Sequence, residues 1–574
     1  MDASSPPTSS PPTSPPPSRA RGWHLFVPKL VTVLRQGYGF ADFRADAMAG
    51  LTVAIVALPL AMALAIASGT TPDKGLVTAV VAGFLVSLLG GSRFQIAGPT
   101  GAFVVVVFGV IQQHGYDGLV LATLMAGAGL VLAGLFRLGT WIKYVPEPVI
   151  VGFTAGIAVI IFSSQIKDLL GLRMETVPAE FLAKWQAYGA ALDSADLATL
   201  LLSAAALALI IGLRRFAPRL PGFLLAVALG ALAVWAFGLP VETIESRFGG
   251  IPSSLPAPVI PEITWARLEE LLPAAFTIWF LGGAESLLSA MIADGMTGRR
   301  HRSNCELVAQ GVANMGSALV GGLPATGALA RTATNVRAGA RSPVAGLLHA
   351  LFLLAFMLLA APLAGWFPLG ALAAILVIVA WNMSEQHKIR HLLAHAPWGD
   401  KAVLVITFLL TVLVDLILAI EVGVVLAAML FMHRMATVVQ VQQGVSMIED
   451  DADDFATPAS DYDQRRDLPP GVEVFLFRGP LFFGAAGQVL ELLDRVGQPP
   501  RALILRLREV PFIDSSGVGA LQEVLRRSRA HGTRVIVTGV QPQPREMLAR
   551  MGFHADGQGL TFAENFAAAL AMVK

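Results

Sequence analysis

The sequence predicts a polytopic α-helical membrane protein of about fourteen segments, arranged as two inverted repeats of seven, followed by a small cytoplasmic α/β domain. Composition is the first reason, because 55% of the 574 residues are hydrophobic and only 14% are charged, whereas soluble domains carry about 25% charged residues. The second reason is a series of apolar blocks between residues 49 and 437. The third is a change to an acidic and then mixed composition beyond residue 445.

Residues 1–22 are expected to form a disordered tail. The first eighteen of them are rich in Pro, Ser and Thr and contain no apolar run. Such a stretch cannot form a packed core, and it lacks the apolar region of a secretory signal. The membrane domain is therefore expected to cover residues 23–444.

The apolar blocks fall into two sets with the same internal order. The first repeat, at about 45–240, has blocks at 49–68, 76–89, 98–111, 118–138, 147–168, 197–213 and 221–238. The second repeat, at about 265–440, has blocks at 274–292, 304–321, 326–337, 343–361, 369–381, 402–417 and 419–437. Spanning a bilayer takes about 20 helical residues, so the third block of each set is expected to be a half-helix. Seven segments per repeat is an odd number, which turns the second repeat upside down in the membrane.

Charge placement sets the expected orientation. The linkers after the even-numbered blocks are basic, as in Arg214-Arg215 and the stretch 299–302, whereas the stretch 240–270 contains several glutamates. The positive-inside rule places basic linkers in the cytoplasm. We therefore expect a multi-pass plasma-membrane protein with both termini and the C-terminal domain in the cytoplasm.

The C-terminal part is expected to be an acidic linker at 445–469 followed by a folded domain at 470–574. Strand patterns lie at 472–477, 502–507 and 535–539, with helical patterns at 485–496 and 517–530. This alternation is typical of a small α/β domain with a largely parallel sheet. The loop Asp514–Gly517 opens the second helix, where Asp and Ser are natural N-caps; a phosphorylated or partner-binding loop is the alternative.

Composition also excludes several classes of function. The net charge of +1 gives no reason to expect a nucleic-acid partner. A single cysteine, Cys305, excludes an intramolecular disulfide and supplies no zinc cluster. We find no paired His and Cys set, no P-loop and no Ser-His-Asp candidate in the sequence. We therefore expect neither an enzyme nor an ATP-driven pump, and no metal or cofactor.

Two short stretches interrupt the apolar chain at equivalent places in the repeats: 98–102 (GPTGA) and 322–331 (GLPATGALAR). Gly and Pro forbid a continuous helix there. Broken helices are tolerated at membrane depth only where they are buried in protein or line a cavity. Two such breaks in inverted repeats predict a transporter binding site, although the breaks could instead merely kink packed helices.

The two broken segments enter the membrane from opposite faces, so their helix N-termini are expected to meet near the midplane. Each N-terminus carries about half a positive charge and unpaired N–H groups, which together form an anion site. Arg331 would add a full positive charge. The expected backbone donors lie near Thr100, Gly101, Ala102, Gly327, Ala328 and Leu329.

Glu285 lies in a segment that should cross lipid, 274–292. A carboxylate there costs about 3 kcal/mol or more unless it is paired or protonated. It is therefore a candidate proton acceptor, cation ligand or partner of Arg331, and Ser289 lies one turn further along the same helix face. The alternative is a static Glu–Arg pair that joins two helices.

Several motifs resemble those of the sulfate permease family of anion transporters, and the C-terminal domain resembles its STAS domain. The motifs are 58–61 (LPLA), 95–100 (QIAGPT), 303–311 (SNCELVAQG), 322–331, Thr334-Asn335 and 514–517 (DSSG). The resemblance implies a seven-plus-seven inverted repeat with a core and a gate domain, an elevator-like motion and a homodimer. It also implies that substrate lies between the first, third, eighth and tenth segments.

By position, the resemblance nominates substrate-binding residues in addition to the backbone donors: Pro59, Met62, Gly98, Thr100 and Ala328 through Arg331, which includes Ala330. An acid at the position of Glu285 resembles bacterial members that are coupled to protons or cations. The sequence departs from many animal relatives at Leu60, where they have Gln, and from some relatives at Ala330, where they have Ser. Their substrate preference therefore does not transfer.

The expected function is secondary active transport of a small oxyanion, sulfate or a C4-dicarboxylate, by proton-coupled symport. Sodium-coupled bicarbonate transport and a passive anion channel are the alternatives. A nucleobase permease shares the inverted-repeat plan, but Arg331 and the STAS-like domain argue against it. The expected partners are a small inorganic or carboxylate anion, a proton or sodium ion, the lipid bilayer and a second copy of the chain.

Overall fold

The computed structural model describes most of the chain. The described residues are 25–140, 146–174, 177–178, 180–218, 220–258, 260–414, 416–438, 440–443, 468–486, 489, 499–556 and 559–573. The expected tail at 1–22, nearly all of the linker at 445–469 and most of the helix expected at 485–496 lie outside them. The chain divides into two compact units, Met1–Val424 and Val425–Lys574.

The first repeat is helical wherever an apolar block was expected. Its elements are α1 (Lys29–Arg35), α2 (Phe40–Ala67), α3 (Pro72–Leu89), β1 (Ala97–Gly98), α4 (Gly101–Leu135), α5 (Glu147–Leu170), α6 (Phe181–Ala190), α7 (Leu197–Phe216), α8 (Gly222–Phe237) and α9 (Ile244–Phe248). α4 accounts for two expected segments, because Gly115 breaks it with φ 70° and ψ 178°. That backbone conformation is open to glycine alone.

The second repeat follows the same order. Its elements are α10 (Trp265–Thr297), α11 (Ser303–Leu319), β2 (Thr326–Gly327), α12 (Leu329–Arg337), α13 (Val344–Leu359), α14 (Ala361–Gly365), α15 (Leu369–Met383), α16 (Gln386–His395), α17 (Trp398–Leu413) and α18 (Leu416–Val438). The third block of each repeat is preceded by a short strand, as the Gly and Pro breaks predicted. Within the described residues, eight helices are long and apolar enough to cross a membrane.

In the first unit, the helices that the sequence analysis missed are α1, α6, α9 and α16, together with the short α14 after α13. In the second unit it missed α21 (Pro542–Arg550) and α22 (Phe566–Ala571). Most of them lack a long apolar run: α16, for example, is QHKIRHLLAH, and none of its residues is buried. A search for spanning blocks does not detect such short helices between spans, because their apolar residues cover only one side.

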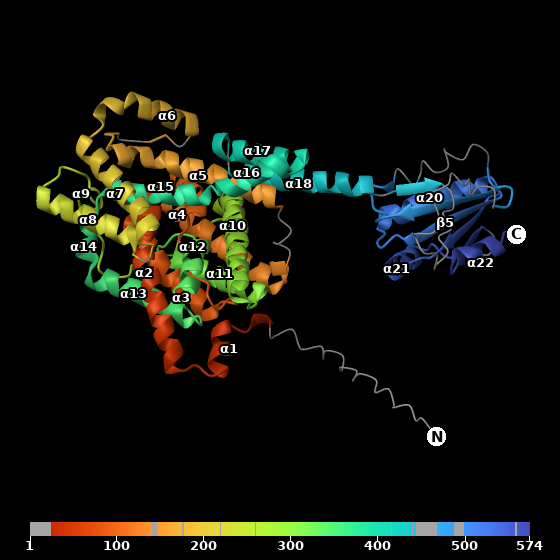
Figure 1. Ribbon diagram of the computed structural model, residues 1–574, viewed down its shortest axis with the longest axis horizontal. Helices are drawn as coiled ribbons and strands as arrows, with labels where there is room; N and C mark the ends of the chain where they lie inside the picture. Colours follow the sequence, from red (N-terminus) through yellow and green to blue (C-terminus); the bar gives the residue numbers. More distant parts are fainter. Residues whose placement is uncertain are drawn as a thin grey trace, which may run out of the picture. The chain divides into compact units, whose positions relative to one another are not determined.

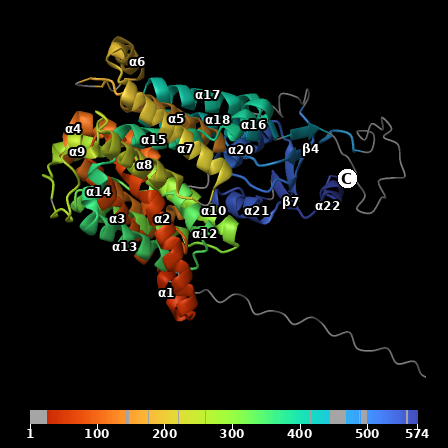
Figure 2. The same cartoon turned by 60° about the vertical axis from the view of Figure 1, so that its left-hand side comes forward.

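The membrane helices pack as two groups. The core helices are α2, α3, α4, α10, α11, α12 and α13, with α12 lying between α2 and α10 (Figure 1). The gate helices are α5, α7, α8, α15 and α17, of which α5, α7, α15 and α17 run beside one another (Figure 2). The arrangement gathers both half-helices and α10, which carries Glu285, into the core helices.

The second unit is a five-stranded sheet in the order β3-β4-β5-β6-β7, and the strands from β4 to β7 are parallel. Its elements are β3 (Gln440–Gln443), β4 (Val472–Arg478), β5 (Ala502–Glu509), α20 (Ser515–Ala530), β6 (Arg534–Thr538), α21 (Pro542–Arg550), β7 (Leu560–Ala563) and α22 (Phe566–Ala571). Two separate apolar clusters line the sheet, one with α20 and α21 and the other with α22. The expected small α/β domain with a largely parallel sheet is confirmed.

The sheet takes in a strand upstream of the boundary expected at residue 444, because β3 pairs antiparallel with β4. Its sequence, QVQQ, has a single apolar residue, so periodicity could not reveal it. In the loop at 514–517, Asp514 caps α20, since its Oδ1 accepts the N–H of Gly517 at 2.8 Å. The Oδ2 of Asp514 accepts the N–H of Phe483 at 3.1 Å. Ser515 and Ser516 are exposed beside this cap.

Within the core helices, α4 and α11 touch backbone to backbone. A Cβ added to Gly127 would lie 2.8 Å from the carbonyl oxygen of Gly311, and a Cβ added to Gly311 would collide with that of Gly127. Only hydrogen on both Cα atoms permits this approach. The contact sets the distance between the first and second repeats.

We predict that Gly311→Ala destabilises the protein by about 1–3 kcal/mol, the usual range for overpacking a tight contact. The thermal unfolding midpoint of detergent-purified protein measures the effect. Gly212→Ala on α7 is the matched control, because nothing lies within 4 Å of its added Cβ. Equal midpoints for the two variants would show that the α4–α11 contact yields without penalty.

Candidate functional site

The two broken segments meet as a pair of two-residue strands. β1 and β2 are antiparallel, with Ala97 opposite Gly327 and Gly98 opposite Thr326. The pairing extends on both sides, since the N–H of Ala328 donates to the carbonyl of Ile96 at 2.8 Å. The N–H of Ile96 in turn donates to Oγ1 of Thr332 at 3.1 Å. The pairing therefore brings the starts of α4 and α12 next to each other.

Ser286 on α10 stabilises the pairing of β1 and β2, which we call the β1–β2 crossing. Its Oγ accepts the N–H of Gly327 at 3.0 Å and shares a 2.7 Å hydrogen bond with Oγ1 of Thr326. Its carbonyl accepts Nε2 of Gln95 at 3.0 Å. Ser286, Thr326 and Gln95 are all buried. Sequence reasoning did not single out Ser286, because a serine in an apolar helix carries no distinct signal.

The backbone donors at the two helix starts differ from those expected. Gly327 and Ala328 cannot offer their N–H groups to a ligand, because Ser286 and Ile96 accept them. Besides the N-cap residue Thr100, the N–H groups at these two helix starts without a hydrogen-bond acceptor among the described residues are those of Gly101, Ala102, Leu329, Ala330 and Arg331. They belong to the first turns of α4 and α12, where no intrahelical carbonyl is available. The N–H groups that remain available to a ligand therefore begin after each of the two short strands.

The side chain of Glu285, a residue of α10, lies next to the start of α4. Its Oε2 accepts the hydroxyl of Thr100, the N-cap residue of α4, at 3.0 Å. The side chain is half-buried, whereas Thr100 is buried. Within the described residues no ion pair joins Glu285 to Arg331, so the static Glu–Arg pair does not form. The carboxylate instead faces the positive end of a half-helix.

Arg331 is buried near the β1–β2 crossing, with 2% of its surface exposed. Its Nη2 donates to the carbonyl of Pro99 at 3.0 Å, but its Nε and Nη1 have no acceptor among the residues that the structure describes. A Cβ at Gly98 would collide with Nη1, so glycine is required there for the guanidinium to approach. A buried charged group with open donors is unfavourable, and an anion is the partner that would complete it.

The remaining nominated residues line the surroundings of the crossing. Pro59 and Met62 are buried on α2, which packs against both α4 and α12. Pro59 lacks an N–H group, so the carbonyl of Ile55 loses its intrahelical donor. Ser289 is 1% exposed and its Oγ has no partner, one helical turn from Glu285.

Two gate residues that the sequence did not indicate close the site from the other side. A Cβ at Gly101 would lie 3.2 Å from Cδ1 of Ile161 on α5 and would collide with Sδ of Met383 on α15. Both are apolar residues within apolar helices, so only the three-dimensional structure distinguishes them. The start of α4 therefore faces an apolar wall provided by the gate helices.

Two buried carboxylates fix the chain that flanks the half-helices. Glu306 on α11 accepts the N–H groups of Gly91 and Ser92 at 2.9 and 3.0 Å, just before β1. Asp46 on α2 accepts those of Arg341 and Ser342 at 2.6 and 3.1 Å, after α12. Both carboxylates are fully buried. Each repeat thus supplies an acid that positions the flank of the other repeat's half-helix.

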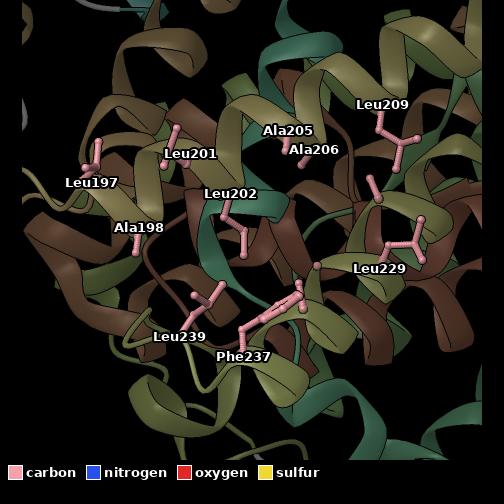
Figure 3. Close-up of a pocket in the computed structure, with 13 residues that line it drawn as sticks. Leu197, Ala198, Leu201, Leu202, Ala205, Ala206, Leu209, Leu229, Phe237 and Leu239 are labelled. Atoms are coloured by element: carbon pink, nitrogen blue, oxygen red, sulfur yellow. The ribbon is translucent and has the colours of Figure 1, made fainter.

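A groove elsewhere in the gate helices is a contrast to this polar site. A hollow of about 660 Å³ lies beside α7 and the α8 region. Figure 3 shows the Leu, Ala and Phe side chains that line it, including Leu201 and Phe237. Every residue that lines it is apolar or glycine. Such a groove offers nothing to an anion, and the candidate site remains the crossing of β1 and β2.

Two parts of the chain match known protein families, and the whole chain is similar to named transporters. Residues 43–407 match the sulfate permease family, and residues 466–569 match the STAS domain. The chain is 43% identical over 528 residues to a Bacillus subtilis protein named "Putative sulfate transporter YvdB", covering 91% of this chain and 96% of the relative. It is 30% identical to "Bicarbonate transporter BicA" of Picosynechococcus sp., covering 89% of this chain and 91% of the relative.

Solved structures agree on the fold. The transmembrane domain of a cyanobacterial BicA is 33% identical with a TM-score of 0.60, and the match covers 67% of this chain and 98% of that one. Murine Slc26a9 in an inward-facing state has a TM-score of 0.84 at 16% identity, covering 97% of this chain and 95% of that one. The second likeness concerns the fold alone.

We predict that Glu306→Ala lowers stability far more than Glu306→Gln. Alanine leaves the buried N–H groups of Gly91 and Ser92 without an acceptor, at about 1–3 kcal/mol each. Glutamine keeps one acceptor oxygen, and the amide of Gln310, now 3.1 Å from Oε1, can rotate to match it. Thermal unfolding of the two purified variants tests the order; equal midpoints would contradict the role of Glu306.

Proposed function

The chain belongs to the sulfate permease family and carries a C-terminal STAS domain, and we propose that it transports a small oxyanion together with protons. Members of this family are anion transporters and not enzymes, and this protein is a multi-pass membrane transporter. The finer proposal is secondary active symport of sulfate or a C4-dicarboxylate. The substrate name of the Bacillus subtilis relative supports sulfate as the first anion to test.

The observation that carries the proposal is the hydrogen bond between Glu285 and Thr100 at the start of α4. The positive end of a half-helix favours a negative charge, and in this state the carboxylate of Glu285 supplies it. An arriving oxyanion would compete for the same positive end. Two negative charges this close repel each other strongly where water is scarce, so anion binding favours proton uptake by Glu285.

The anion would be held by the open donors of both half-helices. The N–H groups of Gly101 and Ala102 lie on one side, and those of Leu329 and Ala330 on the other, with the open Nε and Nη1 of Arg331 nearby. Small side chains allow an oxygen to approach these N–H groups closely. Four backbone donors and a guanidinium suit a compact oxyanion that carries two charges.

The proposed movement is an elevator-like displacement of the core helices against the gate helices. All of the polar groups in the proposed site lie on core elements, while the gate contributes Ile161 and Met383 by van der Waals contact. An apolar wall of this kind can slide past the start of α4 without breaking hydrogen bonds. Cytoplasmic termini, a cytoplasmic STAS domain and a homodimer complete the proposal.

A second candidate function is sodium-coupled bicarbonate transport. The BicA relative from Picosynechococcus sp. favours it, since it is a named bicarbonate transporter at 30% identity. The unpartnered Oγ of Ser289, near Glu285, is an oxygen of the kind that sodium binds. Uptake by proteoliposomes in a pH gradient and then in a sodium gradient separates the two candidates, and competition by sulfate, fumarate, bicarbonate and uracil identifies the substrate class.

We predict that Glu285→Gln abolishes concentrative uptake driven by a pH gradient but retains exchange of labelled for unlabelled anion at equal pH. Glutamine keeps a hydrogen-bond acceptor for Thr100 and cannot take up a proton. Glu269→Gln, an exposed acid on the same helix, is the control and should transport normally. Concentration of the anion by Glu285→Gln in a pH gradient would disprove the coupling role.

We predict that Arg331→Lys raises KM for the anion by about 10- to 100-fold, because charge-assisted hydrogen bonds contribute about 1.5–3 kcal/mol. Lysine keeps the positive charge but loses the planar guanidinium. Arg337→Lys, at the exposed end of the same helix, should leave KM unchanged. Initial uptake rates over a range of substrate concentrations provide the measurement, and an unaltered KM in Arg331→Lys would remove Arg331 from the site.

A further inference from the structure

A second polar pocket, of about 470 Å³, lies in the first unit away from the β1–β2 crossing. Four stretches of chain line it: the connection from α1 to α2, the chain that leads into β1, the end of α10 and the loop after α12. None of the residues that line it belongs to the candidate transport site. The residues that matter for its chemistry are Gln36, Asp42, Arg93, Arg299 and Arg341.

The pocket has more positive than negative charge. Asp42 is bound to Arg341 at 2.8 Å, so these two charges offset each other. Arg93 donates from Nη2 to the neutral Oε1 of Gln36 at 2.6 Å. Arg299 has no hydrogen bond or ion pair to any residue in the part of the chain that the structure describes. Two guanidinium groups therefore lack a counter-charge within the pocket.

Neighbouring cations add to this charge. The pKa of Lys29 is lowered by burial and by the positive charges of Arg302 and Arg93. The pKa of Arg93 is likewise lowered by burial, then by Arg299 and Arg302. Arg302 is satisfied by neutral groups, the carbonyl of Val27 and the hydroxyl of Thr32. These cations repel one another, and a bound anion would relieve that repulsion.

The acids around this group of cations are already engaged, since the buried Asp46 accepts the hydroxyl groups of Tyr38 and Ser342. Asp294 near the end of α10 accepts both the N–H and the ring nitrogen of His301, at 2.9 and 2.7 Å. It raises the pKa of Lys29 only weakly compared with burial and the two arginines. The counter-charge that the pocket lacks must therefore come from outside the described chain.

We propose that this pocket binds a phosphate group, carried either by a lipid headgroup or by free phosphate. Planar guanidinium groups match phosphate oxygens in a bidentate fashion, and Arg93 and Arg299 are available for such contacts. The pocket is more polar than apolar, and because the hydroxyl groups of Tyr38 and Ser342 already donate to Asp46, the guanidinium groups are its donors for a ligand. An anionic lipid is the natural source at a membrane boundary, because such lipids attract clustered Lys and Arg residues.

The position of the pocket links its occupant to the transport site. Arg93 and Phe94 lead directly into β1, and the carbonyl of Phe94 accepts Nδ2 of Asn335 on α12 at 2.9 Å. Arg341 and Ser342 follow α12 and are fixed by Asp46. A phosphate bound here would therefore tie together the flanks of the two half-helices, which should stabilise the core helices as a unit.

The test measures thermal unfolding of the full-length protein in two arms. In the first arm, inorganic phosphate is added to protein in phosphatidylcholine nanodiscs. In the second, phosphatidic acid replaces part of the phosphatidylcholine without added phosphate. We expect at least one ligand to raise the midpoint by about 3 °C or more. A rise in the first arm identifies free phosphate, and a rise in the second alone identifies a lipid headgroup.

The variants assign the effect to the pocket. Arg299→Gln should lose most of the rise, because this exposed side chain has no protein partner and its replacement leaves folding intact. Arg93→Gln should act in the same direction, and Arg300→Gln, an exposed neighbour that does not line the pocket, should keep the full rise. No rise in the native protein, or a full rise in Arg299→Gln, would overturn the proposal.

Discussion

The structure depends on one constraint: polar backbone groups at membrane depth must find partners inside the protein. Two non-helical stretches run through the core helices, and the pairing of β1 with β2 satisfies their central groups. Side chains satisfy further N–H groups of these stretches. Ser286 accepts the N–H of Gly327, Thr332 accepts that of Ile96, and Asn314 accepts that of Ala325 at 2.8 Å. Without these three residues, a broken helix in lipid would be prohibitively unfavourable.

The same constraint decides which groups remain for a ligand. In the second repeat, strand pairing and the Ser286 side chain engage the N–H groups of Ala328 and Gly327, and the helix engages those from Thr332 onward. Between them lies a single turn on each half-helix whose N–H groups have neither kind of partner, represented by Ala102 and Ala330. The proposed anion site is thus the part of the backbone that neither strand nor helix can satisfy. Its place follows from where pairing ends and helix begins.

Local chemistry in the sequence was enough to predict the half-helices and to single out Glu285 and Arg331 as candidates, because Gly, Pro and charged residues are conspicuous in apolar chain. It did not predict that Ala97 would pair with Gly327, since nothing in two-residue strands more than two hundred positions apart specifies register. That pairing engages the N–H of Ala328, and Ser286 accepts the N–H of Gly327, so these two groups are not the free donors that were expected. Ile161 and Met383 were missed for a related reason, because an apolar residue that faces a site resembles one that faces lipid.

In the proposed site, the core helices supply the polar groups and the gate helices supply apolar contacts. This division bears on how the site could open to one side of the membrane or the other. Among the described residues, the side chains of Thr100, Glu285 and Arg331 form hydrogen bonds only with core elements, so their geometry is kept when those helices move as a body. The wall at Gly101 consists of Ile161 and Met383, whose contacts are non-directional and can be replaced by equivalent ones at a new position. A site whose hydrogen bonds were shared with the gate helices would lose them at each displacement. The observed division therefore favours movement of the intact site over remodelling of its donors.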